Sequence, residues 1–229
     1  MTFFDWQRAR QPEQKEQRRQ EILRAAAKLF DETGLEKASL SKIACSAGLS
    51  KAALYRYFES REAIFLELLG GELTGWVARF EAALAPLAGS NDPARVARAF
   101  AASLVDSHRL GALSAATPTI LEHNVSEEVV VAFKTGLIPL FLRLANSLHA
   151  ALPALSMEQV RELLAFAHSA INGLWPAAHP PPAVQRALAR PELELFRVPW
   201  GPTLERMIQL LLEGALAEGA GSSEKTDAA

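Results

Sequence analysis

Residues 39–58, SLSKIACSAGLSKAALYRYF, decide the fold of the chain. Ser39 and Ser50 each precede a helix-forming run, and a serine hydroxyl there accepts a hydrogen bond from an amide that the first helical turn leaves without a partner. Between the two runs, Gly48 allows the positive φ of a tight turn. Two short helices joined by such a turn form a helix-turn-helix, whose second helix enters the major groove of DNA. The stretch therefore predicts a DNA-binding motif.

Further helices are expected on both sides of this motif. A preceding helix runs from about Gln14 and ends at Gly34, with apolar residues at helical spacing. Ser60 caps a longer helix, from Arg61 to about Ala85, which Pro86 stops. Beyond it, apolar periodicity and capping residues predict helices over 92–110, 117–123, 126–152, 156–175 and 202–218.

The composition agrees with an all-α fold. Alanine and leucine dominate and aromatic residues make up only 7%, which favours helices over sheets, and no strand pattern is recognisable. Residues 1–13 lack periodicity and are expected to form a flexible tail. Residues 176–200 contain six prolines and are expected to be extended, with no assigned role. The polar residues 219–229 are expected to be disordered.

Charge, hydropathy and cysteine content narrow the class of protein. Residues 1–60 hold eleven Lys/Arg and eight Asp/Glu, a balance of +3, whereas residues 61–229 hold thirteen and eighteen, a balance of −5. A mildly basic module therefore precedes an acidic body. No apolar run approaches the roughly 18 to 20 residues of a membrane helix, and the single Cys45 fits a reducing compartment, so we expect a cytoplasmic protein without membrane contact.

Catalytic and metal sites are not predicted. The sequence shows no nucleophile–base pair, metal cluster or phosphate loop, so we expect no enzymatic activity and no cofactor. None of the five histidines pairs at i and i+4, which leaves a metal site unsupported. Cys45 is interpreted as a small helical residue, with a redox switch as the alternative.

Residues 17–66 resemble the DNA-binding domain of the TetR family of bacterial regulators. The shared features are an amphipathic first helix that ends at residues 27–30 and is followed by Gly34, the SLSKIA start, the AGLSK turn, and the LYRYFESREA close at residues 54–63. The rest of the chain resembles the family only in its helical layout. The resemblance implies a three-helix DNA-binding domain over 14–62, followed over 63–218 by a helical bundle that binds an effector and dimerises.

The DNA contacts follow from this match and from the reach of the polar side chains. The resemblance places Lys51, Ala52 and Tyr55 where the recognition helix meets DNA, and Tyr57 and Arg61 at phosphates. Cationic and hydroxyl groups of this kind suit phosphate oxygens. The predicted DNA-contacting set is Ser39, Ser41, Lys42, Ser50, Lys51, Ala52, Tyr55, Arg56, Tyr57 and Arg61.

Only Lys51 has hydrogen-bonding capacity in the first turn of the recognition helix, because residues 52 and 53 are alanines. Alanine can still contact a thymine methyl group. Base recognition is therefore expected to depend on Arg56, on DNA shape, or on an N-terminal extension that reaches a minor groove. The cations of that extension are Arg8, Arg10, Lys15, Arg18 and Arg19.

The resemblance implies a homodimer built from the last two long helices, and both carry apolar stripes. The predicted interface is Val160, Leu163, Leu164, Ala167, His168, Ile171, Trp175, Leu204, Met207, Ile208, Leu211 and Leu212. His168 and Trp175 also share a face with Asn172 and are alternative pocket residues. The candidate walls of a ligand pocket are Trp76, Phe80, Phe100, His108, Phe141 and Phe166, with ordinary core packing as the alternative for each.

The expected function is a DNA-binding transcriptional regulator. In its specific form, the prediction is a homodimeric repressor that binds a near-palindromic double-stranded operator and is released by a small apolar or amphipathic effector. A regulator that acts as an activator, and a helical protein-interaction module, are the alternatives.

Overall fold

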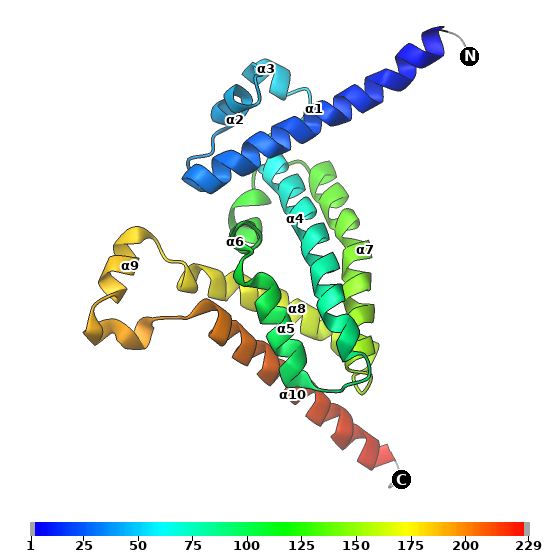
Figure 1. Ribbon diagram of the computed structural model, residues 1–229, viewed down its shortest axis with the longest axis vertical. Coiled ribbons are helices and arrows are strands. Elements are labelled where there is room, and N and C mark those ends of the chain that lie inside the picture. The colour runs from blue at the N-terminus through cyan, green and yellow to red at the C-terminus, as the bar shows by residue number, and fades with distance from the viewer. Residues whose placement is uncertain (1–2, 227–229) are drawn as a thin grey trace. The chain divides into compact units, whose positions relative to one another are not determined.

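The computed structural model describes residues 3–226, with side chains over residues 13–219, and this part of the chain contains helices and no strand (Figure 1). The α-helices are α1 (Phe3–Thr33), α2 (Leu40–Ser46), α3 (Lys51–Leu54), α4 (Arg61–Leu84), α5 (Pro93–Val105), α6 (His108–Ala116), α7 (Glu127–Ala151), α8 (Met157–Ala178), α9 (Pro182–Leu188) and α10 (Trp200–Thr226). Short 3-10 turns span Ala85–Leu87 and Pro191–Phe196, and a π-helical turn spans Thr117–Leu121.

The chain divides into two compact units. The N-terminal unit consists of the residues up to Gly71 together with Thr117–Phe133, and the C-terminal unit consists of Glu72–Ala116 together with the residues from Lys134 onward. Helix α4 is continuous across the boundary, which falls immediately after Gly70 and Gly71. One helix thus belongs to both units.

Capping residues begin the helices of the N-terminal unit as the sequence predicts. The Ser39 hydroxyl accepts from the amide of Lys42 at 3.4 Å, and the Ser50 hydroxyl accepts from the amide of Ala53 at 3.1 Å. Gly34 and Gly48 have φ of +78° and +67°, so both adopt the left-handed conformation that a side chain would strain. Local sequence therefore fixes where these helices start and stop.

The core of the N-terminal unit is formed by one face of each helix. Ile22 of α1, Ile43 of α2 and Leu54 of α3 are fully buried, as are Ile64 and Phe65 of α4. Burying each such side chain contributes about 1.5–3 kcal/mol. Helix α2 packs against α1 and α3, and Phe65 of α4 packs on Phe30 of α1.

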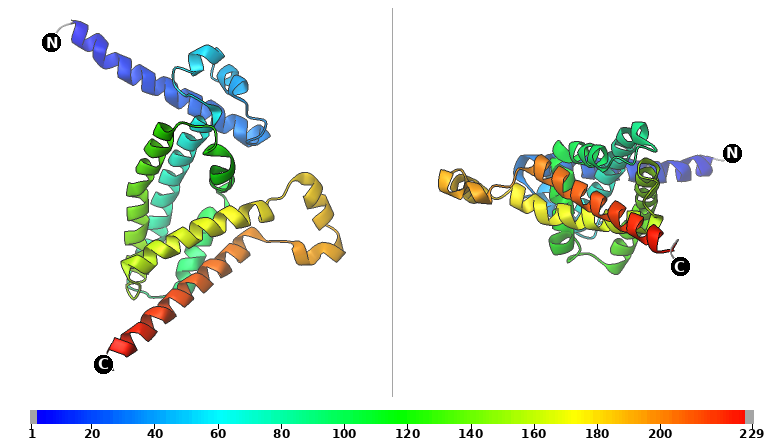
Figure 2. Two further views of the ribbon diagram at one scale, coloured as in Figure 1. Left: turned by 180° about the vertical axis from the view of Figure 1, so that it is seen from behind. Right: turned by 90° about the horizontal axis from the view of Figure 1, so that it is seen from below.

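The C-terminal unit is a bundle in which α10 packs against α5 and α8, and α6 packs against α8. Figure 2 shows α8 and α10 crossing each other along one side of this unit. The predicted helix over 92–110 is two helices, because α5 ends at Val105 and α6 begins at His108. The Ser107 hydroxyl donates to the Ser103 carbonyl at 3.2 Å, a local bond that competes with helix continuation.

The structure differs from the sequence expectations at both ends. Helix α1 begins at Phe3, where a flexible tail over 1–13 was expected, and α10 continues to Thr226, where disorder from 219 was expected. Residues 1–2 and 227–229 lie outside the described residues. Each end prolongs a helix whose inner turns are packed, so elongation adds hydrogen bonds without a new nucleation step.

The proline-rich segment 176–200 is also more regular than expected. Pro176 lies inside α8, Pro182 starts α9 and Pro191 starts the second 3-10 turn. A proline at the first helical position loses no intrahelical hydrogen bond, and its fixed φ already suits a helix. The extended conformation predicted from proline content is therefore wrong for most of this segment.

Candidate nucleic-acid interface and core cavity

Helices α2 and α3 form a helix-turn-helix of the predicted kind. Ile43 and Ala44 of α2 and Leu54 of α3 are buried, and the amide of Leu49 in the turn donates to the Ala44 carbonyl at 2.8 Å. The chain after α3 continues as a helical turn, with the amide of Phe58 bonded to the Leu54 carbonyl at 3.2 Å. Backbone hydrogen bonds therefore run through the motif from Ser39 to Phe58.

Most of the predicted DNA-contacting residues lie on the outside of this motif. Lys51 and Tyr55 are neighbours there, with the Lys51 ammonium 5.9 Å from the centroid of the Tyr55 ring. The Lys42 ammonium donates to the Lys37 carbonyl at 3.1 Å. Tyr57 is half-buried. The exposed members of the set are Ser39, Ser41, Lys42, Ser50, Lys51, Ala52, Tyr55 and Arg56.

Arg61 has a structural partner that the sequence did not predict. Its guanidinium donates to the Glu62 carboxylate at 2.8 and 3.1 Å and to the Leu35 carbonyl at 3.4 Å, and its side chain is 25% exposed. Glu62 is itself buried. Arg61 therefore ties the start of α4 to the chain after α1, and a phosphate would compete with these bonds.

Arg19 is also held inside the N-terminal unit. It donates to both carboxylate oxygens of Glu67 and to the Tyr57 carbonyl at 3.1 Å, and its guanidinium carbon lies 4.3 Å from the centroid of the Phe58 ring. This corrects the expectation that Arg19 reaches a minor groove, since its donors are committed within the fold. No sequence signal links residues 48 positions apart in this way.

The other cations of the proposed extension differ from one another. Arg18 forms an ion pair with Glu21 at 2.5 Å, and Lys15 is exposed on α1. The side chains of Arg8 and Arg10 lie outside the described residues. Cys45, the single cysteine, is exposed on α2.

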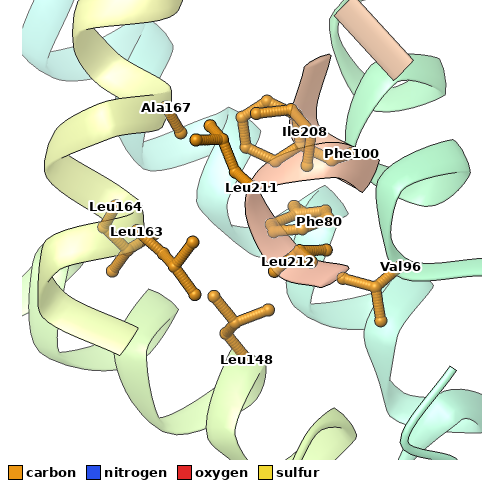
Figure 3. Close-up of a pocket in the computed structure, with 10 residues that line it drawn as sticks. All are labelled: Phe80, Val96, Phe100, Leu148, Leu163, Leu164, Ala167, Ile208, Leu211 and Leu212. Atoms are coloured by element: carbon orange, nitrogen blue, oxygen red, sulfur yellow. The ribbon is translucent and has the colours of Figure 1, made fainter. Parts of the chain in front are cut away.

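A small cavity lies in the core of the C-terminal unit (Figure 3). Its volume is about 20 Å³, which is room for about one water molecule, and every side chain around it is apolar. Helices α4, α5, α7, α8 and α10 all contribute. The lining residues are Phe80, Val96, Phe100, Leu148, Leu163, Leu164, Ala167, Ile208, Leu211 and Leu212.

Three of the predicted pocket residues lie at or beside this cavity. Phe80 and Phe100 line it with ring centroids 5.3 Å apart in an edge-to-face arrangement, and Trp76 stacks on Phe80 at 5.6 Å. The Trp76 indole donates to the Ser103 hydroxyl at 2.8 Å, and that hydroxyl donates to the Phe100 carbonyl at 2.6 Å. This chain of hydrogen bonds fixes the aromatic side of the cavity.

The other three predicted pocket residues lie elsewhere. Phe141 and Phe166 are exposed on α7 and α8, the latter at 47%, so neither is a wall of the cavity. The sequence predicts both as pocket walls because each is spaced at helical intervals from other apolar residues. In the structure, the helical faces that carry them point to solvent. His108 belongs to a different cluster.

That cluster consists of His108, Trp175, His179 and Trp200. The Trp175 and His179 rings stack at 3.7 Å, and the rings of His108 and Trp200 pack edge-on against Trp175 at 5.2 and 5.0 Å. Gly111 of α6 lies against the face of Trp175, so closely that a side chain there would overlap the indole. The cluster joins the starts of α6 and α10 to the end of α8.

The pKa of His179 is lowered within this cluster. Burial is the main cause, because it disfavours the charged ring, and the nearby His108 lowers the pKa further. A hydrogen bond from His179 Nδ1 to the Trp175 carbonyl, at 3.2 Å, acts in the opposite direction. The neutral ring is therefore favoured where it stacks on the indole.

Two protein-family models match this chain, and together they cover most of its length. Residues 22–68 match the model of the bacterial regulatory proteins of the tetR family, and residues 71–219 match the model of the tetracyclin repressor-like C-terminal domain. The chain belongs to the TetR family. It is therefore a DNA-binding transcriptional regulator whose helix-turn-helix lies at α2 and α3.

Curated relatives match this TetR-family chain over short stretches. An HTH-type transcriptional regulator of Mycobacterium tuberculosis is 45% identical over 64 residues, which are 28% of the chain and 30% of the relative. The HTH-type transcriptional repressor KstR2 of Mycolicibacterium smegmatis is 36% identical over 70 residues, 31% of the chain and 34% of the relative. These matches span only about a third of each relative's length.

Solved structures share the fold of the regulator over most of its length. Thermus thermophilus FadR, solved in complex with lauroyl-CoA, aligns with a TM-score of 0.56 and 23% identity over 86% of this chain and 94% of that one. A transcriptional regulator from Rhodococcus sp. Rha1 aligns with a TM-score of 0.54 and 20% identity, over 87% and 96% of the two chains. No helix in the described part of the regulator is long and apolar enough to cross a membrane.

The predicted dimer interface falls on two different sides of α8 and α10. Five of its residues are accessible: Leu164, His168, Ile171, Met207 and Leu211. The other seven are buried within a single chain, and this corrects their assignment, because a partner subunit cannot contact side chains that the chain's own core covers. They are Val160, Leu163, Ala167, Trp175, Leu204, Ile208 and Leu212.

Proposed function

We propose that this regulator is a homodimeric repressor that leaves its operator when a small apolar or amphipathic effector enters the core cavity. The carrying observation is the wholly apolar cavity, which draws its lining from five helices of the C-terminal unit. One of these, α4, continues unbroken into the N-terminal unit, where its Phe65 packs on Phe30 of α1 with ring centroids 6.1 Å apart. An effector that moves α4 would thus act on a helix that both units share.

The DNA-contacting surface in this proposal is the exposed side of α3 and the turn after it. The long, exposed polar side chains on this surface are Lys51, Tyr55 and Arg56. The Lys51 ammonium lies over the Tyr55 ring, and Arg56 adds a second positive charge. Tyr57 and Arg61 become positions that support this surface, since one is half-buried and the other is bonded to Glu62. The predicted contacts at Ser39, Ser41, Lys42, Ser50 and Ala52 stay in the proposal.

The dimer in this proposal uses the outer faces of α8 and α10. Phe166 and Leu174 lie on one and Met207 and Leu210 on the other, all exposed or half-buried in the single chain. A partner would remove these apolar side chains from water. A two-fold axis would then set two recognition helices about 34–36 Å apart on a near-palindromic operator.

The size of the cavity gives the effector its leverage. Because about 20 Å³ holds no more than a water molecule, any effector must push the surrounding helices apart to bind. Such a ligand prefers the expanded state and shifts the population toward it. The fold shared with a FadR that binds lauroyl-CoA supports a long apolar group as the part that enters.

DNA binding is tested by fluorescence anisotropy on the duplex upstream of the regulator's own gene, over a range of salt concentrations. Lys51→Ala is expected to weaken binding and to reduce the slope of log affinity against log salt by about 2, one phosphate contact for each subunit of the dimer. Lys28→Ala is the matched control, because its exposed pairing with Glu32 at 3.9 Å contributes little. Salt-independent behaviour on every duplex would refute the proposal in favour of a protein-interaction module.

Effector release is tested by titrating acyl-chain compounds into the preformed DNA complex. Ala167→Val places extra methyl groups into the cavity and is expected to reduce release by the compound, with release measured relative to the variant's own DNA affinity in the absence of compound. Release that is equal in the wild type and in this variant would place the effector outside the core cavity.

A further inference from the structure

An arm, residues 180–199, protrudes from the C-terminal unit between α8 and α10 (Figures 1 and 2). It holds α9 and the 3-10 turn Pro191–Phe196. Arg197 ties the two together, donating to the carbonyls of Leu188 at 2.5 Å, Ala189 at 2.9 Å and Arg190 at 3.2 Å. The arm therefore has a defined conformation of its own.

This defined conformation has no core within the chain. No residue of α9 or of the 3-10 turn is buried. Leu195 is 90% exposed, Phe196 is 63% exposed, and Val184 is exposed as well. In a single chain these apolar side chains remain in water, so a surface that covered them would stabilise the arm.

A second uncovered apolar surface lies on α7, and we call it the α7 strip. Ile138, Phe141 and Leu142 fall at i, i+3 and i+4, so they share one helical face, and all three are exposed, Ile138 at 55%. The arm and the α7 strip belong to the same unit. Within that unit they lie at opposite edges, with α8 and α10 between them, in both the front and back views (Figures 1 and 2). An arm cannot reach the strip of its own chain.

A second copy of the chain resolves this separation. Suppose that two chains pair through the outer faces of α8 and α10. The two-fold axis then lies in the plane of the interface and passes between the arm edge and the α7 edge of each chain. Rotation about this axis places the arm edge of one chain opposite the α7 edge of the other. The arm of each chain then lies over the α7 edge of the other. The same operation covers both arms and both strips, as an isologous interface requires.

We propose that the arms are exchanged between subunits, with Leu195 and Phe196 of one chain packed on the α7 strip of the partner chain. This inference rests on the proposed dimer and adds a second contact region to it, outside α8 and α10. The partner is a second copy of this chain, because the arm and the strip are complementary in character and only the two-fold operation brings them together.

The first experiment measures the dimer dissociation constant by sedimentation equilibrium. Leu195→Ser with Phe196→Ser is expected to raise it by at least about 100-fold, since each dimer loses four buried apolar side chains. Val105→Ser is the control, because Val105 is an exposed apolar residue on α5, outside the arm and the α7 strip, and its loss is expected to leave the constant unchanged. Far-ultraviolet circular dichroism checks that helicity is unchanged in each variant.

The second experiment asks which chain the arm touches. In a Cys45→Ser background, one preparation carries Leu195→Cys and another, with a larger tag, carries Ile138→Cys. Mild oxidation of the mixture is expected to give a disulfide-linked heterodimer, and neither preparation alone should give a dimer of comparable yield. A double variant that forms its disulfide within one chain would overturn arm exchange.

The outcomes separate the two proposals. A wild-type protein that stays monomeric at all concentrations overturns both the dimer and the arm exchange. A wild-type dimer whose dissociation constant is unchanged by the serine substitutions overturns arm exchange alone and leaves the α8 and α10 pairing standing. A weakened dimer with the intermolecular disulfide supports both.

Discussion

Gly111→Ala is expected to destabilise the C-terminal unit, although alanine is the better helix former. Gly111 lies in α6, and a Cβ added there would be 2.7 Å from Cδ2 of Trp175 and closer still to two further ring atoms. The indole has little room to retreat, because His179 stacks on it at 3.7 Å and Trp200 packs on it at 5.0 Å. Helix α6 and helix α8 must therefore move apart.

The magnitude follows from two opposed effects. Replacing glycine by alanine inside a helix contributes about 1 kcal/mol of stability. Overpacking a filled core costs about 1–3 kcal/mol, and a contact this short with an immobile ring places Gly111→Ala at the upper end. The net loss in the free energy of unfolding is expected to be about 2 kcal/mol.

Urea unfolding followed by circular dichroism, at one fixed protein concentration, measures this loss. Gly71→Ala is the matched control, since an added Cβ there meets nothing within 4 Å, and it is expected to stabilise the protein by about 0.4–1 kcal/mol. The double variant Gly111→Ala with Trp175→Phe should recover part of the loss, because the smaller ring leaves room for the methyl group. If Gly111→Ala stabilises the protein as much as Gly71→Ala does, the close packing of Gly111 on the indole is refuted.

Two further predictions concern the charged and titratable groups. The lowered pKa of His179 means that the unfolded chain binds a proton more readily than the folded chain, so the free energy of unfolding should fall as the pH drops below about 6.5. The variant His179→Phe keeps a ring stacked on Trp175 and removes the titrating group. It should therefore flatten this pH dependence, measured by urea unfolding from about pH 7.5 to 5.5. Arg19→Met should lower the free energy of unfolding by about 2 kcal/mol, because it leaves the Glu67 carboxylate without its guanidinium partner. The same variant should keep the wild-type salt slope for DNA, and a reduced slope would instead place Arg19 on the phosphates.

The parts of the fold that sequence predicts well are those decided within a few residues. Ser39 and Ser50 cap their helices because the donor amide is three positions away. Gly48 forms the turn because glycine adopts a positive φ without steric strain. The same locality makes the helix-turn-helix recognisable from its sequence alone. The Glu67 carboxylate that Arg19 binds and the Leu35 carbonyl that Arg61 binds lie 48 and 26 positions away, and no periodicity links them.

The proline-rich segment shows a second limit. Proline content predicts an extended chain when each proline is taken alone. Pro182 and Pro191 instead occupy first turns of helices, and Arg197 caps the end of α9 through three carbonyls. An arginine nine residues beyond the carbonyl it binds leaves no local pattern, so the arm is not predictable from its sequence.

Helix α8 shows why an apolar stripe cannot by itself name what covers it. Val160, Leu163 and Ala167 share a stripe that the sequence assigns to a partner, yet this stripe is buried in the chain's own core. Phe166, predicted to be a pocket wall, faces outward on the same helix. Neighbouring residues on a helix differ by about 100° in direction. A prediction that chooses the wrong face of α8 therefore assigns core residues to the proposed dimer surface and surface residues to the cavity. Burial in the folded chain decides between the two, and it leaves the outer faces of α8 and α10, the α7 strip and the arm exposed in the single chain.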